Sequence, residues 1–147
     1  MNTDNTTAQL DPNRDRIFKD LSGLVSFNSP HSTPELADQH SAAADWVTAA
    51  VAEHGFEVER HPTVDNADVI IGRRAGTDGA PTVLLYSHYD IVPAGDPAAW
   101  TSDPFTLTAR DGRWYGRGAS DCKGNIAMHL ETCLLYTSPS PRDRQKS

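Results

Sequence analysis

The feature that most constrains the fold is an uninterrupted apolar run at residues 82–86 (TVLLY), near the middle of the chain. A strand with one face in water alternates apolar and polar residues, whereas a strand buried on both faces is apolar throughout. The run therefore predicts a central strand of a sheet that is covered on both sides.

Four other short segments have the pattern of strands, and Asp111-Gly112 between the last two is a strong hairpin signal. These segments are 56–59, 67–72, 105–108 and 113–115.

Apolar residues at helical spacing predict three helices. The first begins at Asp11-Pro12 and ends before Pro30, the second runs from a capping-box pattern at 32–35 to Gly55, and the third begins near Gly124. Helices, then strands, then a returning helix predict the α/β class. We expect a three-layer sandwich with a mixed, largely parallel sheet.

Composition excludes several kinds of partner. The net charge of the 147 residues is −7, and an acidic chain without a block of Lys and Arg is a poor ligand for nucleic acids or anionic membranes. No window approaches the ~18 apolar residues of a membrane-spanning helix, and the N-terminus lacks the pattern of a signal peptide. With only Cys122 and Cys133, a disulfide framework is excluded. We expect a cytoplasmic protein with reduced thiols.

The first polar group that could carry chemistry is Ser87-His88-Tyr89-Asp90, directly after the apolar run. In an extended chain, residues i and i+2 point to the same side, so His88 and Asp90 can face one site together. A metal-bound histidine usually has its other ring nitrogen held by a carboxylate or a carbonyl. A polar pair in a surface loop is the alternative that this pattern leaves open.

The second group is the segment 115–124 (YGRGASDCKG), in which Asp121 lies just ahead of the last predicted helix. The segment has Asp where a dinucleotide fingerprint needs a third Gly, and Lys123 precedes Gly124 instead of following it as in a phosphate-binding loop. Residues 118–122 (GASDC) lack the final Gly that a serine-hydrolase elbow requires. No motif places a base beside Cys122.

Together the two groups are much more specific than either alone. Between Val83 and Asn125 the chain also contains 100–105 (WTSDPF) and 113–119 (RWYGRGA). This combination resembles the zinc-dependent peptidase family that includes non-specific dipeptidases, aminoacylases, acetylornithine deacetylase and succinyl-diaminopimelate desuccinylase. The resemblance covers about residues 11–133, and it is greatest to the dipeptidase branch.

The resemblance implies roles for three residues. His88 is similar to a ligand of one zinc ion, Asp121 to the carboxylate that bridges two zinc ions, and Asp90 to the catalytic residue that orients the histidine and tunes the metal-bound water. Cobalt or manganese would also suit these ligands. The glycines at 118 and 124 look like scaffold for the Asp121 loop. The five other histidines have no partner spacing and are expected at surface or packing positions: His31, His40, His54, His61 and His129.

The implied function is metal-dependent hydrolysis of the amide bond in a dipeptide or an N-acyl amino acid, by an enzyme whose complete form is a homodimer. Members of the family also use a Glu-Glu pair, a later acidic ligand and a distal His, and none of these follows Asp121. Glu131 is a lone acid that we expect to be solvated. We therefore expect a disordered N-terminus at 1–10, a partial catalytic domain at 11–133 and a non-native or disordered tail at 134–147. Such an N-terminal fragment should be inactive by itself.

Three other functions stay open. One is an N-acyl-amino-acid deacylase or desuccinylase of the same family. Another is a hydrolase that uses Ser120 or Cys122 as its nucleophile. The third is a binding module without catalytic activity.

Overall fold

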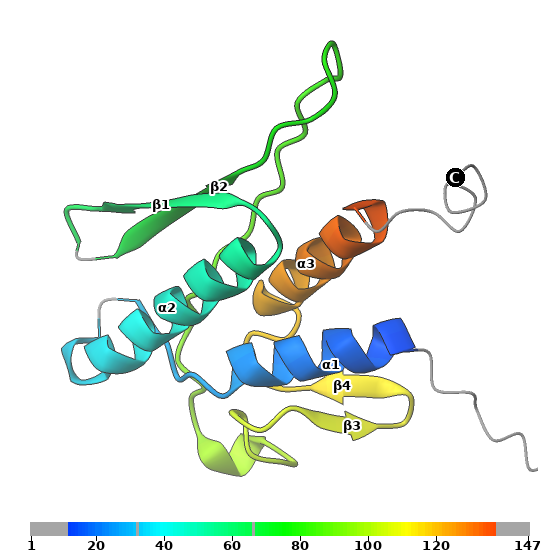
Figure 1. Ribbon diagram of the computed structural model, residues 1–147. Helices are drawn as coiled ribbons and strands as arrows, with labels where there is room; N and C mark the ends of the chain where they lie inside the picture. Colours follow the sequence, from blue (N-terminus) through cyan, green and yellow to red (C-terminus); the bar gives the residue numbers. More distant parts are fainter. Residues whose placement is uncertain (1–11, 32, 66, 138–147) are drawn as a thin grey trace, which may run out of the picture.

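The computed structural model describes residues 12–31, 33–65 and 67–137 (Figure 1). Within these ranges the chain is of the mixed α/β class, as the sequence predicts. None of its helices has the length and apolar character that crossing a membrane requires. The elements are, in chain order, α1 (Pro12–Val25), the 3-10 helix η1 (Pro34–Leu36), α2 (Ala37–Glu53), β1 (Glu57–Pro62), β2 (Asp68–Arg73), the 3-10 helix η2 (Pro97–Ala99), β3 (Thr108–Arg110), β4 (Arg113–Tyr115) and α3 (Lys123–Thr137).

The strands form two separate antiparallel pairs, β1 with β2 and β3 with β4. The β3–β4 turn is the predicted hairpin: Asp111 and Gly112 have φ angles of 51° and 72°, and positive φ at both central residues suits a type I′ turn. The expected three-layer sandwich with a largely parallel sheet is not found in the described residues. Parallel pairing there consists of an isolated bridge between Pro30 and Ile91.

The prediction of a buried strand at residues 82–86 is wrong for this structure. The segment belongs to no strand, and Val83, Leu84 and Tyr86 are 75%, 87% and 77% exposed. It follows an arm that extends away from the helices after β2 (Figure 1). A continuous apolar run signals burial only when other strands and helices cover it. In the described part of the chain no strand pairs with either of its edges.

Helix α1 lies between two apolar clusters, and α3 runs beside it (Figure 1). Leu21 and Val25 pack with residues of the β3–β4 side and of α3, while Leu24 packs with α2 and α3. Since helical residues three and four apart share a face, these three side chains form one stripe wide enough to contact both neighbours. The two clusters are Leu21, Val25, Leu107 and Ala127, and Leu24, Val47, Ile126 and Leu130.

Glu131 is not solvated, so this expectation is wrong. Its side chain is 5% exposed, and its two carboxylate oxygens accept hydrogen bonds from the Arg16 guanidinium at 3.0 and 2.6 Å. A carboxylate on an amphipathic helix is solvated by default, but a facing guanidinium allows it to be buried with both oxygens paired. The pair links α1 to α3 over a wide separation in sequence.

The expected domain boundaries fall partly outside the described residues. Residues 1–10, Ser32 of the capping pattern and residues 138–147 are not described. Helix α3 continues through Thr137, so residues 134–137 are helical. The nature of the tail stays a prediction.

We expect residues 82–86 to drive self-association of the 147-residue chain, because an exposed apolar extended segment can pair with another copy. Replacing Leu84 with Lys should lower aggregation, measured by light scattering during concentration. The variant reduces the magnitude of the net charge by one, so stronger charge repulsion between chains cannot explain a decrease in aggregation. The matched control is Val64→Lys at another exposed apolar position. Equal improvement in both variants would contradict the prediction.

Candidate metal centre

His88 and Asp90 face one another, as alternation in an extended chain predicts. His88 Nδ1 lies 2.9 Å from Asp90 Oδ1 and 3.3 Å from the Asp90 carbonyl oxygen. Both side chains are a little over one third exposed. A carboxylate on Nδ1 fixes the ring orientation and leaves Nε2 to face the rest of the site.

The segment that carries this pair is held from two sides. The Tyr89 hydroxyl donates to the carbonyl oxygen of Asp68 at 3.0 Å and accepts from the Asp68 N–H at 3.2 Å, which ties it to β2. On the other side, the buried Ser29 hydroxyl donates to the Tyr89 carbonyl at 3.0 Å, and the Ile91 N–H donates to the Ser29 carbonyl at 3.1 Å. The loop after α1 and the strand β2 therefore position the segment of His88, although the segment itself belongs to no strand.

Asp121 comes from the turn before α3, and two glycines let that turn pack closely. Gly118 has a φ of 81°, and a Cβ there would lie 2.8 Å from Ile91 Cγ2. A Cβ on Gly124 would lie 2.2 Å from the Ala119 carbonyl oxygen, closer than atoms can approach. These contacts support the scaffold role that the resemblance suggests for both glycines.

Lys123 fixes the same turn from within. Its side chain is fully buried, and Nζ donates to the carbonyl oxygens of Leu24 and Phe27, each at 2.8 Å. Its backbone N–H donates to the Gly118 carbonyl at 2.9 Å. Burial lowers the pKa of Lys123 to about 8, although the charge of Asp90 acts in the opposite direction. Sequence reasoning missed this residue, since a lysine two positions after an aspartate gives no signal of burial.

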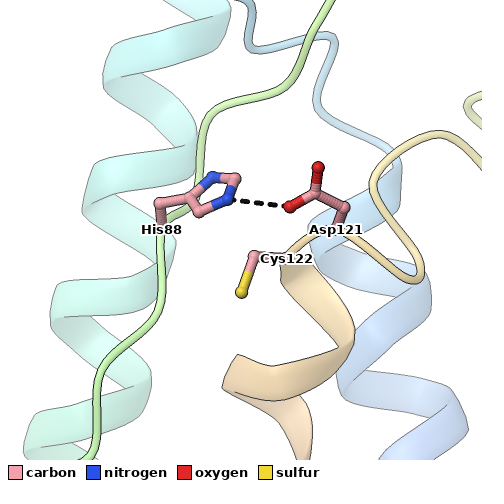
Figure 2. Close-up of side chains that lie close together, drawn as sticks. All are labelled: His88, Asp121 and Cys122. Atoms are coloured by element: carbon pink, nitrogen blue, oxygen red, sulfur yellow. Dashed lines mark hydrogen bonds and ion pairs between the residues drawn. The ribbon is translucent and has the colours of Figure 1, made fainter.

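The two segments meet at His88 and Asp121, where His88 Nε2 lies 3.0 Å from Asp121 Oδ1 (Figure 2). Asp121 is 85% exposed, so the site opens to solvent. Burial by itself lowers the pKa of His88, but the hydrogen bond to Asp121 and the charge of Asp90 outweigh it. The net effect raises the pKa of His88 above its ordinary value.

Cys122 completes a group of potential metal ligands. Sequence reasoning considered this cysteine only as a nucleophile. One ligand atom each from His88, Asp121 and Cys122 lies within 4.8 Å of the others (Figure 2). Imidazole, carboxylate and thiolate are the donors that Zn²⁺ takes. The donor set therefore fits a zinc-type metal ion. The only cue in the sequence was the adjacency of Cys122 to Asp121.

The other five histidines lie outside this group, where they make contacts of their own. His54 Nδ1 contacts the Ala50 carbonyl within its helix, His31 pairs with Asp65 at 3.1 Å, and His61 pairs with Glu59 at 3.1 Å. The remaining two are His40, whose ring lies against Tyr89, and His129, whose Nδ1 lies 3.3 Å from the Ser87 hydroxyl.

A histidine held by one carboxylate and aimed at a second is an arrangement suited to binding a metal ion. Residues 84–143 match the model of "Peptidase family M20/M25/M40". This matched segment contains His88, Asp90 and Asp121. The resemblance inferred from the sequence is confirmed.

Known proteins agree with this assignment. Cysteinylglycine-S-conjugate dipeptidase of Corynebacterium striatum is 63% identical over 130 residues, covering 88% of the chain and 29% of the relative. Succinyl-diaminopimelate desuccinylase of Paracidovorax citrulli is 38% identical over 116 residues, which cover 75% of this chain and 30% of the relative. The chain thus spans under a third of these relatives. Human carnosine dipeptidase 1 shares the fold, with a TM-score of 0.74 and 24% identity, over 85% of this chain and 30% of its own.

We expect Gly124→Ala to lower the free energy of unfolding by about 1–3 kcal/mol, because the added methyl group forces Ala119 and the turn apart. Chemical denaturation followed by circular dichroism measures the change. The control is Gly76→Ala, where a Cβ meets nothing within 4 Å and the change should be neutral or slightly stabilising. Equal effects in both variants would show that the close packing at Gly124 is unimportant.

We expect Lys123→Met to lower the free energy of unfolding by about 1–3 kcal/mol, because two buried carbonyl groups lose their donor. The exposed Lys19 on α1 provides the control, and Lys19→Met should stay within about 0.5 kcal/mol of the parent.

The pH dependence of this difference identifies its cause. The pKa of Lys123 is about 8 in the folded chain and near 10.5 in the unfolded chain, so the unfolded chain binds more protons between these values. The stability of the parent relative to Lys123→Met should therefore rise as the pH increases from about 8 to 10.5. A difference that stays flat over this window would argue against a buried ammonium.

Proposed function

We propose that this chain forms part of a metal-dependent dipeptidase, an enzyme that hydrolyses the amide bond of a dipeptide. The observation that carries the proposal is the convergence of His88, Asp90 and Asp121 from two distant segments onto one site. The identity of 63% to a dipeptidase supports this substrate class over the N-acyl amino acids of the desuccinylases, to which the identity is 38%.

The proposed site holds two zinc ions, with cobalt or manganese as substitutes, in the complete enzyme. His88 would hold one ion through Nε2, and the Asp121 carboxylate would be shared between the two ions. A bound zinc ion would polarise the amide carbonyl and lower the pKa of water at the site. Of these ligands, Asp121 is exposed enough to contact ions on the solvent side.

Asp90 is the proposed catalytic residue that acts on His88. When its carboxylate accepts a hydrogen bond from the Nδ1–H group, Nε2 keeps its lone pair for the metal, and the ring is held in this orientation. Carboxylates in this position typically change metal affinity or activity by 10–100-fold when replaced.

The rest of the enzyme is proposed from the relatives, since the chain spans 29% of the dipeptidase length. The 147-residue chain contains no Glu-Glu pair after Asp121, the pair that supplies the general base in the family it resembles, so we expect it to be inactive by itself. We propose that the complete catalytic domain is a three-layer sandwich with a largely parallel sheet, whose further strands cover residues 82–86. A homodimer in the cytoplasm is part of the same proposal, and a chain with only two cysteines, Cys122 and Cys133, fits a reducing compartment.

The test uses the complete reading frame that contains this chain, cloned from genomic DNA. We expect the protein to hydrolyse cysteinylglycine and its S-conjugates and to lose activity in a chelator. Asp90→Asn should lower kcat/KM by about 10–100-fold, and His88→Ala should lower it further. The control is His61→Ala, an exposed histidine on β1, which should keep full activity.

Three outcomes would contradict the proposal. One is dipeptide hydrolysis that continues in the chelator. Another is hydrolysis of N-succinyl-diaminopimelate in preference to dipeptides, which would indicate the desuccinylase function. The third is turnover by the 147-residue chain that His88→Ala abolishes, which would refute the expected inactivity of the chain alone.

A further inference from the structure

We infer that Cys122 Sγ is a third ligand for a thiophilic divalent ion, such as Zn²⁺ or Co²⁺, held in this chain by His88 and Asp121. The inference rests on the metal site of the proposed function and assigns it a residue that the resemblance does not. It also predicts that the 147-residue chain binds one such ion without further ligands from elsewhere.

The geometry supports a site with three ligands from two segments. One ligand atom of each residue already lies within 4.8 Å of the others. Donor atoms around tetrahedral zinc are separated by roughly 3.5 Å, given bond lengths of ~2.0–2.3 Å. His88 Nε2 and Asp121 Oδ1 are already 3.0 Å apart, so the remaining adjustment is the approach of these two groups to Cys122 Sγ, by no more than roughly 1.3 Å. The Asp121 side chain can turn toward the sulfur, because it is 85% exposed.

Cys122 is positioned more firmly than Asp121. The residue is 9% exposed, and its sulfur accepts a hydrogen bond from Asn125 Nδ2 at 3.1 Å. A neutral amide that contacts the sulfur can orient it as a ligand. Because Cys122 is buried, the approach of a substrate to its sulfur is restricted, which favours coordination over nucleophilic catalysis. When the sulfur–metal bond forms, the thiol proton passes to solvent.

The choice of metal follows from the sulfur. Thiolate selects Zn²⁺ and other soft or borderline ions, whereas carboxylate and water alone suit Mg²⁺ or Mn²⁺. A site of one imidazole, one carboxylate and one thiolate should therefore bind Co²⁺ and Zn²⁺ and discriminate against Mg²⁺. A fourth position would stay open for water or substrate, as in catalytic zinc sites.

The test is a Co²⁺ titration of the complete, metal-free 147-residue chain without added thiols, followed by absorption spectroscopy. We expect the visible bands of bound Co²⁺ together with a near-ultraviolet band from sulfur-to-cobalt charge transfer. Cys122→Ser should lose the near-ultraviolet band, keep visible bands and bind Co²⁺ at least ~10-fold more weakly. Cys133→Ser is the matched control and should give the parent spectrum.

His88→Ala should lose both sets of bands, and circular dichroism should show that every variant keeps the parent's helix content. Visible bands without a sulfur band in the parent chain would overturn the role of Cys122 and leave the His88–Asp121 site standing. A sulfur band that persists in Cys122→Ser and disappears in Cys133→Ser would also overturn it. Absence of any cobalt spectrum would overturn the inference for this chain, whereas the dipeptidase assay of the complete reading frame decides the proposed function separately.

Discussion

A single buried ammonium group connects the parts of this structure that matter for its site. Lys123 is fully buried and donates to the Leu24 carbonyl in the last turn of α1, where helical carbonyls lack partners within the helix, and to the Phe27 carbonyl in the loop that follows. The same residue begins α3, and its backbone donates to Gly118. Because a buried charge without partners is costly, Lys123 restricts the turn before α3 to this arrangement.

Both halves of the candidate metal centre depend on the loop that follows α1. Phe27 in this loop accepts a hydrogen bond from Lys123, which fixes the turn of Asp121. Ser29, two residues further along, is hydrogen-bonded to Tyr89 and Ile91, which fixes the segment of His88. The short loop after α1 therefore determines how the segment of His88 and the turn of Asp121 are placed relative to each other. This explains how the site forms although residues 82–86 are in no sheet.

Local signals in the sequence predicted the hairpin and the helices well, and two predictions that concerned burial failed. The hairpin at Asp111-Gly112 and the helix end at Gly55, which has a φ of 78°, depend on the backbone preferences of adjacent residues. The burial of residues 82–86 and the exposure of Glu131 depend on what packs against them, which the sequence does not state. The apolar run lacks partners in the described chain, while Glu131 has one in Arg16.

The sequence by itself determined the candidate members of the site, because His88 and Asp90 alternate in an extended chain and Asp121 lies in a family motif. Tertiary structure alone decided the different environments of three successive residues. Asp121 faces solvent, Cys122 is buried beside His88, and Lys123 is in the core. Neighbours in a tight turn point in different directions, and the contacts made by Gly118 and the loop after α1 determine which direction each one takes.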